Sequence, residues 1–480
     1  MRHHELNLFL DPAGKGPLYL QVAESIQQAI RGGRIQTGIS LPGTRELADR
    51  LGVTRNTIAA ALRGLEAQGW VVVRPQSGFF VADSLPESPT GSVAPQGHPR
   101  QAGFDVPSRL SPVTDLGHIH MDLTDGVADP RLAPTEALSK AYQRGLKLKG
   151  VELLGSSDFK GLARLRKALI EHLSLQRGCA FGPDQLLLTR STSMAVSLVA
   201  QALVGSEGAV ALEDPGHPEV RETLIQACGA TLHGVPVDDD GMLLEPLRAL
   251  VARTHLSLLV LTPQCHYPTG AVLAQPRREA ILALASEHRI PILELDCEYD
   301  YLHAPPRPLA ADDPTGQVIY VGSLSRIFAP GIRLGFMVTP ESLADRLAKA
   351  RQRLDWQGDP LLEWALSELL IDGEHQRQLR RIRKAAGARR EALGDSLRHS
   401  LGEHLQFDGS KGGMGLWLQG QGPLEDPERF DLWIKACAMK GLKLRRGSAF
   451  RVHGEPLAAT RLGFTAHTPE ELQQAVVWMT

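Results

Sequence analysis

The sequence lacks the features of membrane-spanning and secreted proteins. No apolar run in its 480 residues reaches the roughly 18 residues that a transmembrane helix needs, and the beginning, MRHHELNLFL, has no signal-peptide core. Cysteine is scarce and never forms a CxxC pair, which argues against a disulfide framework or a zinc site; the five are Cys179, Cys228, Cys265, Cys297 and Cys437. We therefore expect a cytoplasmic protein with buried thiols, no bound metal and no membrane partner.

The net charge is also small, but it is unevenly distributed. The chain carries a formal charge of −2, with 22% charged and 42% hydrophobic residues, as in ordinary globular proteins. Residues 16–82 hold seven Arg against four Asp and Glu, which leaves the excess of negative charge to the rest of the chain. This asymmetry favours an anionic partner for the front of the protein.

The length predicts more than one domain, and the composition indicates where they divide. A chain of 480 residues exceeds what one hydrophobic core normally organises. Residues 83–117 are rich in Pro, Gly and Ser and lack apolar periodicity, as is typical of a linker. We predict a front domain over 1–82, a linker over 83–117 and a back domain over 118–480. The back domain would have a large part (118–340) and a small part (341–480).

The front segment has the pattern of a helix-turn-helix. A first helix presents one apolar stripe before the Gly32-Gly33 stop, formed by Leu18, Val22, Ile26 and Ile30. Next, Thr44 is placed to cap a short helix, Gly52 to make a turn, and Thr54 to cap a second helix. The second helix leaves Arg55, Asn56 and Thr57 in its exposed first turn, where side chains reach bases and phosphates in a major groove.

A hairpin is predicted to follow the second helix. WVVVRPQSGFFVAD alternates as two strands, and Gly78 at the turn allows close approach to a phosphate backbone. From the residues alone, a helical packing module with solvated Arg and Thr side chains is an open alternative. However, LPGTRELADRLGVTRNTIAAALRGLEAQGW followed by SGFFV resembles the GntR-type winged helix. The resemblance implies binding to a double-stranded DNA operator, and the candidate residues are Thr44, Arg45, Thr54, Arg55, Asn56, Thr57 and Gly78.

The back segment alternates buried strands with helices. Strand-like runs cover residues 185–189, 209–214, 256–263, 290–296 and 317–323. This alternation predicts an α/β domain with a mostly parallel sheet, whose ligand-binding groups lie at the strand ends. The polar stretches that follow these strands are therefore the candidate ligand-binding segments.

Five such stretches form a constellation, although each alone is an ordinary cap, loop or turn. Ser191 and Thr192 open a helix, where backbone N–H groups could hold a phosphate. His217 lies in EDPGHPEV, Tyr267 in HYPTG, and Asp296 and Tyr299 in ELDCEYDY. The last stretch, SLSRIFAPGIRLGF, contains Ser323, Ser325, Arg326 and Arg333.

In this order the five stretches resemble fold type I aminotransferases, which use pyridoxal 5'-phosphate (PLP). The resemblance implies PLP-contacting roles for Ser191, Thr192, His217, Tyr267, Asp296, Tyr299, Ser323, Ser325, Arg326 and Arg333, and gives Arg461 the grip on a substrate carboxylate. A winged helix joined to such a domain is the layout of the MocR group of bacterial regulators. Several positions depart from the pattern, and an alignment with MocR sequences places Leu295 rather than Asp296 at the ring nitrogen.

The most consequential departure is Arg326, which stands where the family has a lysine. That lysine forms a Schiff base with PLP and later moves a proton, whereas a guanidinium is always protonated and is a poor nucleophile. The leading hypothesis is a homodimeric DNA-binding regulator without catalytic residues. It would sense an amino acid, PLP or their adduct, with any PLP held non-covalently. An active aminotransferase with a DNA-binding appendage and a DNA-binding dimer without a ligand are the alternatives.

Overall fold

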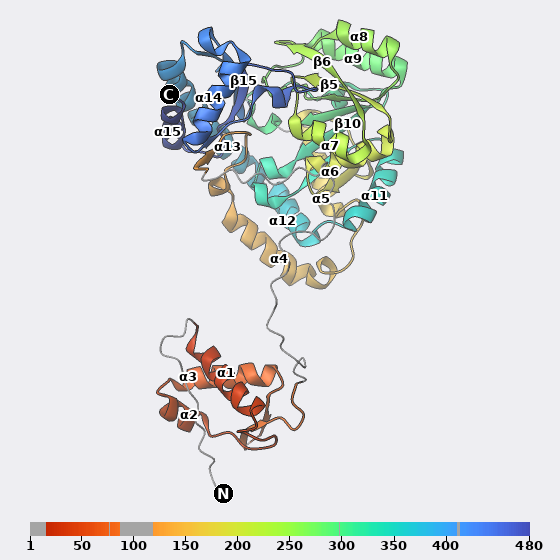
Figure 1. Ribbon diagram of the computed structural model, residues 1–480. Helices are drawn as coiled ribbons and strands as arrows, with labels where there is room; N and C mark the ends of the chain where they lie inside the picture. Colours follow the sequence, from red (N-terminus) through yellow and green to blue (C-terminus); the bar gives the residue numbers. More distant parts are fainter. Residues whose placement is uncertain (1–15, 76, 87–118, 297, 410–412) are drawn as a thin grey trace. The chain divides into compact units, whose positions relative to one another are not determined.

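A computed structural model describes residues 16–75, 77–86, 119–296, 298–409 and 413–480 (Figure 1). These residues form two compact units, one on either side of residues 87–118. Most of the predicted linker and Cys297 lie outside the described residues. Of the four described cysteines, Cys179, Cys265 and Cys437 are buried and Cys228 is half-buried.

The first unit is a three-helix domain with a two-stranded hairpin. Its elements are α1 (Leu18–Arg31), α2 (Thr44–Leu51), α3 (Arg55–Ala67), β1 (Val71–Arg74) and β2 (Gly78–Val81). The two strands are antiparallel, with Val71 opposite Val81 and Arg74 opposite Gly78. Val22, Ile26 and Ile30 of the predicted stripe are buried, whereas Leu18, at the first position of α1, is exposed.

One predicted cap is wrong and the other is confirmed. Helix α2 begins at Thr44 itself, and its N-cap is Gly43, which has no side chain to accept a hydrogen bond. Thr54 caps α3, because its Oγ1 accepts a hydrogen bond from the Thr57 N–H at 3.2 Å. The difference follows from the one-residue shift of the α2 start, which frees the Thr44 hydroxyl from capping.

The second unit contains an eight-stranded sheet in the order β4-β11-β10-β9-β8-β5-β6-β7. All five predicted strands are present, as β4 (Leu186–Thr189), β5 (Ala209–Asp214), β8 (Leu256–Leu261), β9 (Ile292–Asp296) and β10 (Val318–Ser323). The other three are β6 (Thr231–Asp238), β7 (Gly241–Met242) and β11 (Gly335–Val338). β11 is antiparallel to β10 and β4, and β7 is antiparallel to β6, so the sheet is mostly parallel as predicted.

Helices cover both faces of this sheet, which explains its two apolar cores. One face packs against helices that include α5 (Ala163–Arg177), α8 (Leu244–Arg253), α9 (Gln275–His288) and α12 (Pro360–Ile371). The other packs against α6 (Thr192–Val199), which continues as a π-helix over Ala200–Val204, α7 (Pro218–Cys228) and α11 (Glu341–Asp355). The two cores therefore enclose the sheet from both faces and hold the strand ends in fixed positions.

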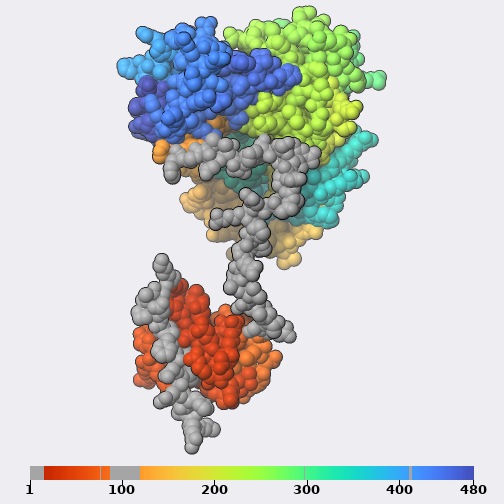
Figure 2. Space-filling model, viewed as in Figure 1, coloured from red at the N-terminus to blue at the C-terminus, as the bar shows by residue number. Residues whose placement is uncertain are grey.

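The C-terminal part of this unit is a smaller layer, blue in Figures 1 and 2. Its sheet has the order β12-β13-β15, formed by β12 (Leu405–Gln406), β13 (Gly415–Gly420) and β15 (Ala459–Gly463). Helices α13 (Glu374–Leu401), α14 (Pro427–Met439) and α15 (Pro469–Met479) pack with it. Strand β3 (Met121–Asp122) pairs with β14 (Leu442–Lys443), so the start of the unit joins its end; α4 (Thr135–Leu153) and α10 (Leu309–Asp312) complete the elements.

Candidate DNA-binding surface and ligand site

The first turn of α3 is an exposed polar surface. Arg55 and Asn56 are exposed, while Thr57 is half-buried and its hydroxyl lies 2.8 Å from that of Thr54. Below this turn, Ile58 and Leu62 are fully buried and hold the helix on the domain core. The fold therefore leaves the amino-terminal end of α3 open to a partner, which is how recognition helices meet the major groove.

Two further elements extend the polar surface of the first unit. Arg45 is exposed in the first turn of α2. At the hairpin, Gly78 is exposed with φ +94°, a backbone conformation that L-residues rarely adopt, and nothing would lie within 4 Å of a Cβ there. Of the candidate DNA contacts, the structure thus leaves Arg45, Thr54, Arg55, Asn56 and Gly78 open to solvent, whereas Thr44 and Thr57 are half-buried.

At the sheet of the second unit, three segments converge where the resemblance implies a phosphate site. Strand β11 lies between the ends of β4 and β10, so Gly335 pairs with both Thr189 and Ser323. A Cβ on Gly335 would lie 3.1 Å from the carbonyl carbon of Ser191. The structure therefore brings the Ser191–Thr192 segment and the Ser323 segment together.

The hydroxyl groups near Gly335 differ in whether they already accept a hydrogen bond from the backbone. Ser191 caps α6 by accepting the Met194 N–H at 3.1 Å, and Ser325 accepts the Leu334 N–H at 3.0 Å, so both already have backbone partners. Thr192 is half-buried at the first position of α6, where helix N–H groups and the helix dipole favour an anion. Arg333 is exposed at φ +49° in the turn before β11. The donor set is compatible with a phosphate.

Asp296 and Tyr299 lie away from this place. Leu295 lines the same small cavity as Thr192 and His217, and successive residues of a strand point to opposite faces. Asp296 accordingly points into the other core, where its Oδ2 lies 3.1 Å from Arg177 Nε and accepts the Tyr320 hydroxyl. The geometry thus agrees with the MocR register, in which Leu295 is on the ligand side of β9.

Arg177 is the centre of the buried cluster that holds Asp296 and Tyr299. Its guanidinium bonds Asp300 Oδ2 at 2.9 Å and lies 4.0 Å from the centroid of the Tyr299 ring. The Tyr299 hydroxyl donates to the Gln176 carbonyl at 2.8 Å. Burial raises the pKa of Asp296, with the Arg177 charge opposing it. For Asp300, burial also favours a raised pKa, but the charge and hydrogen bond of Arg177 together with His172 and His375 lower it.

Tyr267 fills the space beside His217. The two rings stack with centroids 4.1 Å apart and an interplanar angle of 20°, and the Arg461 guanidinium lies 4.5 Å from the Tyr267 centroid. Burial raises the pKa of the Tyr267 phenol, which therefore stays neutral. His217 Nδ1 lies 2.8 Å from Glu219 Oε2, without the alignment of a hydrogen bond, and Glu219 also pairs with Arg445 at 2.5 Å. Aromatic and charged groups of the chain thus pack against one another here.

Arg326 is turned toward the beginning of the second unit. It closes a short 3₁₀ turn (Leu324–Arg326) after β10, and its own carbonyl accepts the Tyr301 hydroxyl at 2.8 Å. Nη1 donates to the Gly126 carbonyl at 2.6 Å, and Nη2 lies 3.6 Å from Asp125 Oδ2. The side chain therefore ties two distant segments together through a permanently charged group.

Arg461 has an internal carboxylate partner that the sequence did not reveal. Its Nη2 bonds Glu298 Oε1 at 2.5 Å and its Nη1 donates to the Pro268 carbonyl at 2.9 Å. Arg461 is 0% exposed and Glu298 is 4% exposed. Although burial opposes ionisation, the charges of Arg461 and Arg326 hold the pKa of Glu298 below its ordinary value. Glu298 is part of ELDCEYDY, but nothing in that stretch indicates that its partner is Arg461, 163 positions later.

The cavity beside Leu295 is too small for PLP. Thr192, His217, Glu219 and Leu295 line a cavity of about 20 Å³, which is room for about one water molecule. Leu295 offers no carboxylate to a pyridine nitrogen, and Arg326 offers no nucleophilic amine. The site as described therefore does not fit the ring and aldehyde of PLP.

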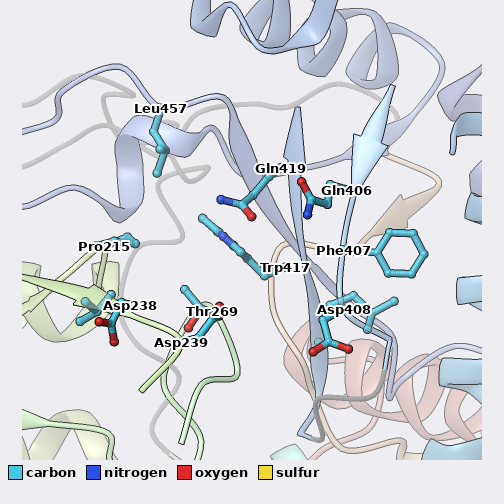
Figure 3. A pocket seen from close by; sticks show the side chains of 13 residues that line it. Pro215, Asp238, Asp239, Thr269, Gln406, Phe407, Asp408, Trp417, Gln419 and Leu457 are labelled. Carbon is cyan, nitrogen blue, oxygen red and sulfur yellow. The ribbon is translucent and has the colours of Figure 1, made fainter. Parts of the chain in front are cut away.

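A larger cavity of about 440 Å³ lies nearby, between the two parts of the second unit (Figure 3). Asp238 and Thr269 line it from the large part, and Phe407 and Trp417 from the small part. Its volume is in the range of small-molecule sites. Trp417 packs edge-on against Phe450 at 5.1 Å, and Phe450 lies 6.2 Å from Tyr267, so an aromatic wall separates this cavity from the His217–Tyr267 stack.

Two common functional features are missing from the described ranges. No group of three or more His, Cys, Asp or Glu residues among them is arranged to hold a metal ion. No helix formed by these residues combines the length and the apolar character needed to cross a membrane.

Comparison with known proteins matches the two units of the chain to two different families. Residues 120–477 match the family "Aminotransferase class I and II", and residues 18–81 match "Bacterial regulatory proteins, gntR family". Among solved structures, LysN, an α-aminoadipate aminotransferase from Thermus thermophilus, superposes with a TM-score of 0.69 at 24% identity, covering 76% of this chain and 92% of that chain. A kynurenine aminotransferase from Pyrococcus horikoshii gives 0.69 at 23% identity, covering 75% and 90%. These likenesses establish the aminotransferase type I fold of the second unit.

Curated relatives share both parts of the chain. The probable rhizopine catabolism regulatory protein MocR of Rhizobium meliloti is 27% identical over 98% of this chain and 94% of its own length. The transcriptional regulator TauR of Rhodobacter capsulatus is 29% identical over 92% of both chains. The chain belongs to the aminotransferase class I and II family and, with its GntR-type DNA-binding domain, is a MocR-type transcription regulator.

Proposed function

We propose that this protein regulates transcription in the bacterial cytoplasm as a homodimer. Its GntR-type domain binds an operator, and its aminotransferase-like domain senses a small molecule without converting it. The effector class that the resemblance suggests is an amino acid, PLP or a preformed adduct of the two, and its site is the cavity of about 440 Å³ rather than the small cavity at Leu295. Any such ligand is held non-covalently.

The contacts of Arg326 are the observation that carries the non-catalytic part of this proposal. Its guanidinium is bonded to the Gly126 carbonyl and faces the Asp125 carboxylate. A permanently protonated group with these partners neither attacks an aldehyde nor moves a proton near neutral pH. Among the residues that the structure describes, no geometric feature favours an active aminotransferase.

The cavity in Figure 3 supports the sensing part. It has the volume of a small-molecule site and lies between the large and small parts of the domain. A ligand that contacts both parts would favour one relative arrangement of them, and a change of that kind is a common route from ligand binding to DNA binding.

An exposed apolar strip supports the dimer. Leu146, Leu148 and Val151 of α4 and the adjacent Leu154 are all at least 46% exposed. Exposed apolar side chains clustered on one helix are typical of a protein interface, and a two-fold dimer would bring two winged helices to paired half-sites. Val151→Glu should therefore convert a dimer to a monomer in light scattering. The exposed Arg380→Glu should leave the mass unchanged.

Operator binding with and without effectors tests the function. DNA recovered by selection with the purified protein is titrated in the presence of single amino acids, PLP, or both. We expect salt-dependent specific binding whose affinity changes with a subset of these compounds, and no turnover of amino acid and 2-oxo acid pairs. Binding that responds to no compound would leave a DNA-binding dimer without sensing, and measurable transamination would contradict the proposal.

A further inference from the structure

The Glu298 carboxylate lies in a site built to hold a carboxylate. Arg461 Nη2 bonds one oxygen at 2.5 Å, and the Met414 N–H donates to the other at 2.8 Å. The Cys265 thiol lies 3.6 Å from that second oxygen. A guanidinium and a backbone N–H that converge on two oxygens of one carboxylate are the groups that recognise a free carboxylate in a binding site.

Two glycines make room for this arrangement. Gly413 has φ +96°, and a Cβ there would lie 2.3 Å from Glu298 Oε2 and 2.9 Å from Cys265 Sγ. At Gly415, a Cβ would lie 2.7 Å from Arg461 Nε. The backbone beside the carboxylate and beside the guanidinium is therefore shaped around these two groups. A side chain at either glycine would displace one of them.

The site is also closed from the surface and held by its neighbours. Arg461 contacts the Tyr267 ring and the Pro268 carbonyl, and Tyr267 stacks on His217. Arg461 Nε is buried without a hydrogen-bond partner among the described residues, so Glu298 is the one described carboxylate bonded to this guanidinium. Because Arg461 and Glu298 are both buried, each needs the other: either one alone would be an uncompensated buried charge.

We propose that Arg461, the Met414 N–H and Gly413 form a small-carboxylate site that Glu298 occupies from within the chain. A free carboxylate does not enter the wild-type site, because Glu298 is tethered beside Arg461 and competes at high effective concentration. When the Glu298 side chain is shortened, the same groups bind a small carboxylate from solution. One consequence rests on the proposed function: if the domain senses an amino acid, the carboxylate of that ligand must either displace Glu298 or bind elsewhere.

Chemical rescue of full-length Glu298→Ala tests this site without DNA. Thermal unfolding is followed in matched concentrations of sodium formate, sodium acetate and sodium chloride. We expect the midpoint of the aminotransferase-like domain to fall by about 5 °C or more in chloride. Formate and acetate should both restore it saturably, because Glu298→Ala removes one methylene and the carboxylate and so vacates a space the size of acetate. The wild-type midpoint should respond equally to all three salts.

The double variant Glu298→Ala/Arg461→Met is the matched control. It removes both charges, so it should be more stable than Glu298→Ala and should not distinguish formate from chloride. If Glu298→Ala does not fold in chloride, its refolding yield in formate and in chloride gives the same comparison. A response of Glu298→Ala that is the same in formate and chloride would overturn the proposal. Failure of operator binding or of effector sensing would leave this result unaffected.

Discussion

The two units of this regulator present their functional groups in opposite ways. In the winged helix, Arg45, Arg55 and Asn56 are exposed on short helices whose caps and turns are set by adjacent residues. In the aminotransferase-like domain, Arg326 and Arg461 are bonded to segments about 160 to 200 positions away in the chain. The groups of the winged helix are open to a partner, whereas those of the aminotransferase-like domain already have partners within the chain. Retention of a fold therefore does not preserve the access on which its chemistry depends.

The largest effect is expected from the buried ion cluster of the second unit. Arg177→Ala removes the partner of two buried carboxylates, Asp296 and Asp300. Breaking a buried pair by removing one partner typically costs about 3–5 kcal/mol of stability. Urea unfolding should show the transition of the aminotransferase-like domain shifted to lower urea, and that of the winged helix unchanged. Arg248→Ala, an exposed arginine, is the control; equal stability of both variants would contradict the buried role of Arg177.

Acid should destabilise the same unit through a histidine pair. The rings of His172 and His375 lie 4.2 Å apart, and burial lowers their pKa values to about 3 and about 4, with Arg177 reinforcing and Asp300 opposing the shift. Arg383 also disfavours charge on His375. Because the folded pKa lies below the unfolded one, this stability is present above about pH 6.5 and is lost as pH falls.

Comparison of wild type with His375→Gln measures this effect. At pH 5 the loss should reach roughly 2 kcal/mol per histidine relative to pH 7. Urea unfolding at the two pH values should therefore show a smaller pH dependence in His375→Gln. An identical pH dependence in the two proteins would show that His375 does not stay neutral in the folded state.

On the open surface, Arg55→Ala should weaken specific operator binding by roughly 1–3 kcal/mol. The expected cause is the loss of a contact to a base or phosphate in the first turn of α3. Arg63→Ala, further along the same helix and also exposed, is the matched control. Fluorescence anisotropy with specific and random DNA compares the two variants. Equal losses of affinity for Arg55→Ala and Arg63→Ala would remove Arg55 from the recognition surface.

The cap of α3 should contribute less. Thr54→Ala removes the acceptor for the Thr57 N–H and should lower the stability of the winged helix by about 1 kcal/mol. Thr54→Ser keeps the hydroxyl and should be close to wild type. Unfolding of the first transition measures both, and equal losses for Ala and Ser would mean that the threonine methyl, not the hydrogen bond, matters.

The smallest expected effect is that of restoring a lysine. Arg326→Lys with added PLP should give no adduct that borohydride traps, because the cavity at Leu295 is too small for the ring. An absorbance spectrum before and after reduction checks this. A trapped adduct in Arg326→Lys, but not in wild type, would mean that Arg326 alone had abolished the chemistry.

Local sequence signals predicted the architecture well. The helix-turn-helix, the cap at Thr54 and all five expected strands depend on neighbouring residues and on apolar periodicity. The Thr44 cap was wrong by one position, since Gly43 precedes the helix instead. The side on which Asp296 lies depends on the exact register of β9, which a single alternating strand does not fix without its neighbours.

The partners in the ligand site could not be predicted from local patterns. The pairing of Glu298 with Arg461 and of Arg326 with Asp125 joins residues far apart in sequence. The Tyr267–His217 stack likewise depends on the packing of two loops. Such contacts form only when the sheet is assembled. A motif therefore identifies the functional side chains but not their partners.

A titration of the wild-type protein with PLP, followed by borohydride reduction and mass spectrometry, tests the central claim most directly. The account predicts an unchanged protein mass, because Arg326 forms no covalent bond with the aldehyde and the ring site is filled by the chain. A mass increase of one reduced phosphopyridoxyl group on a lysine, accompanied by transamination of an amino acid, would contradict it.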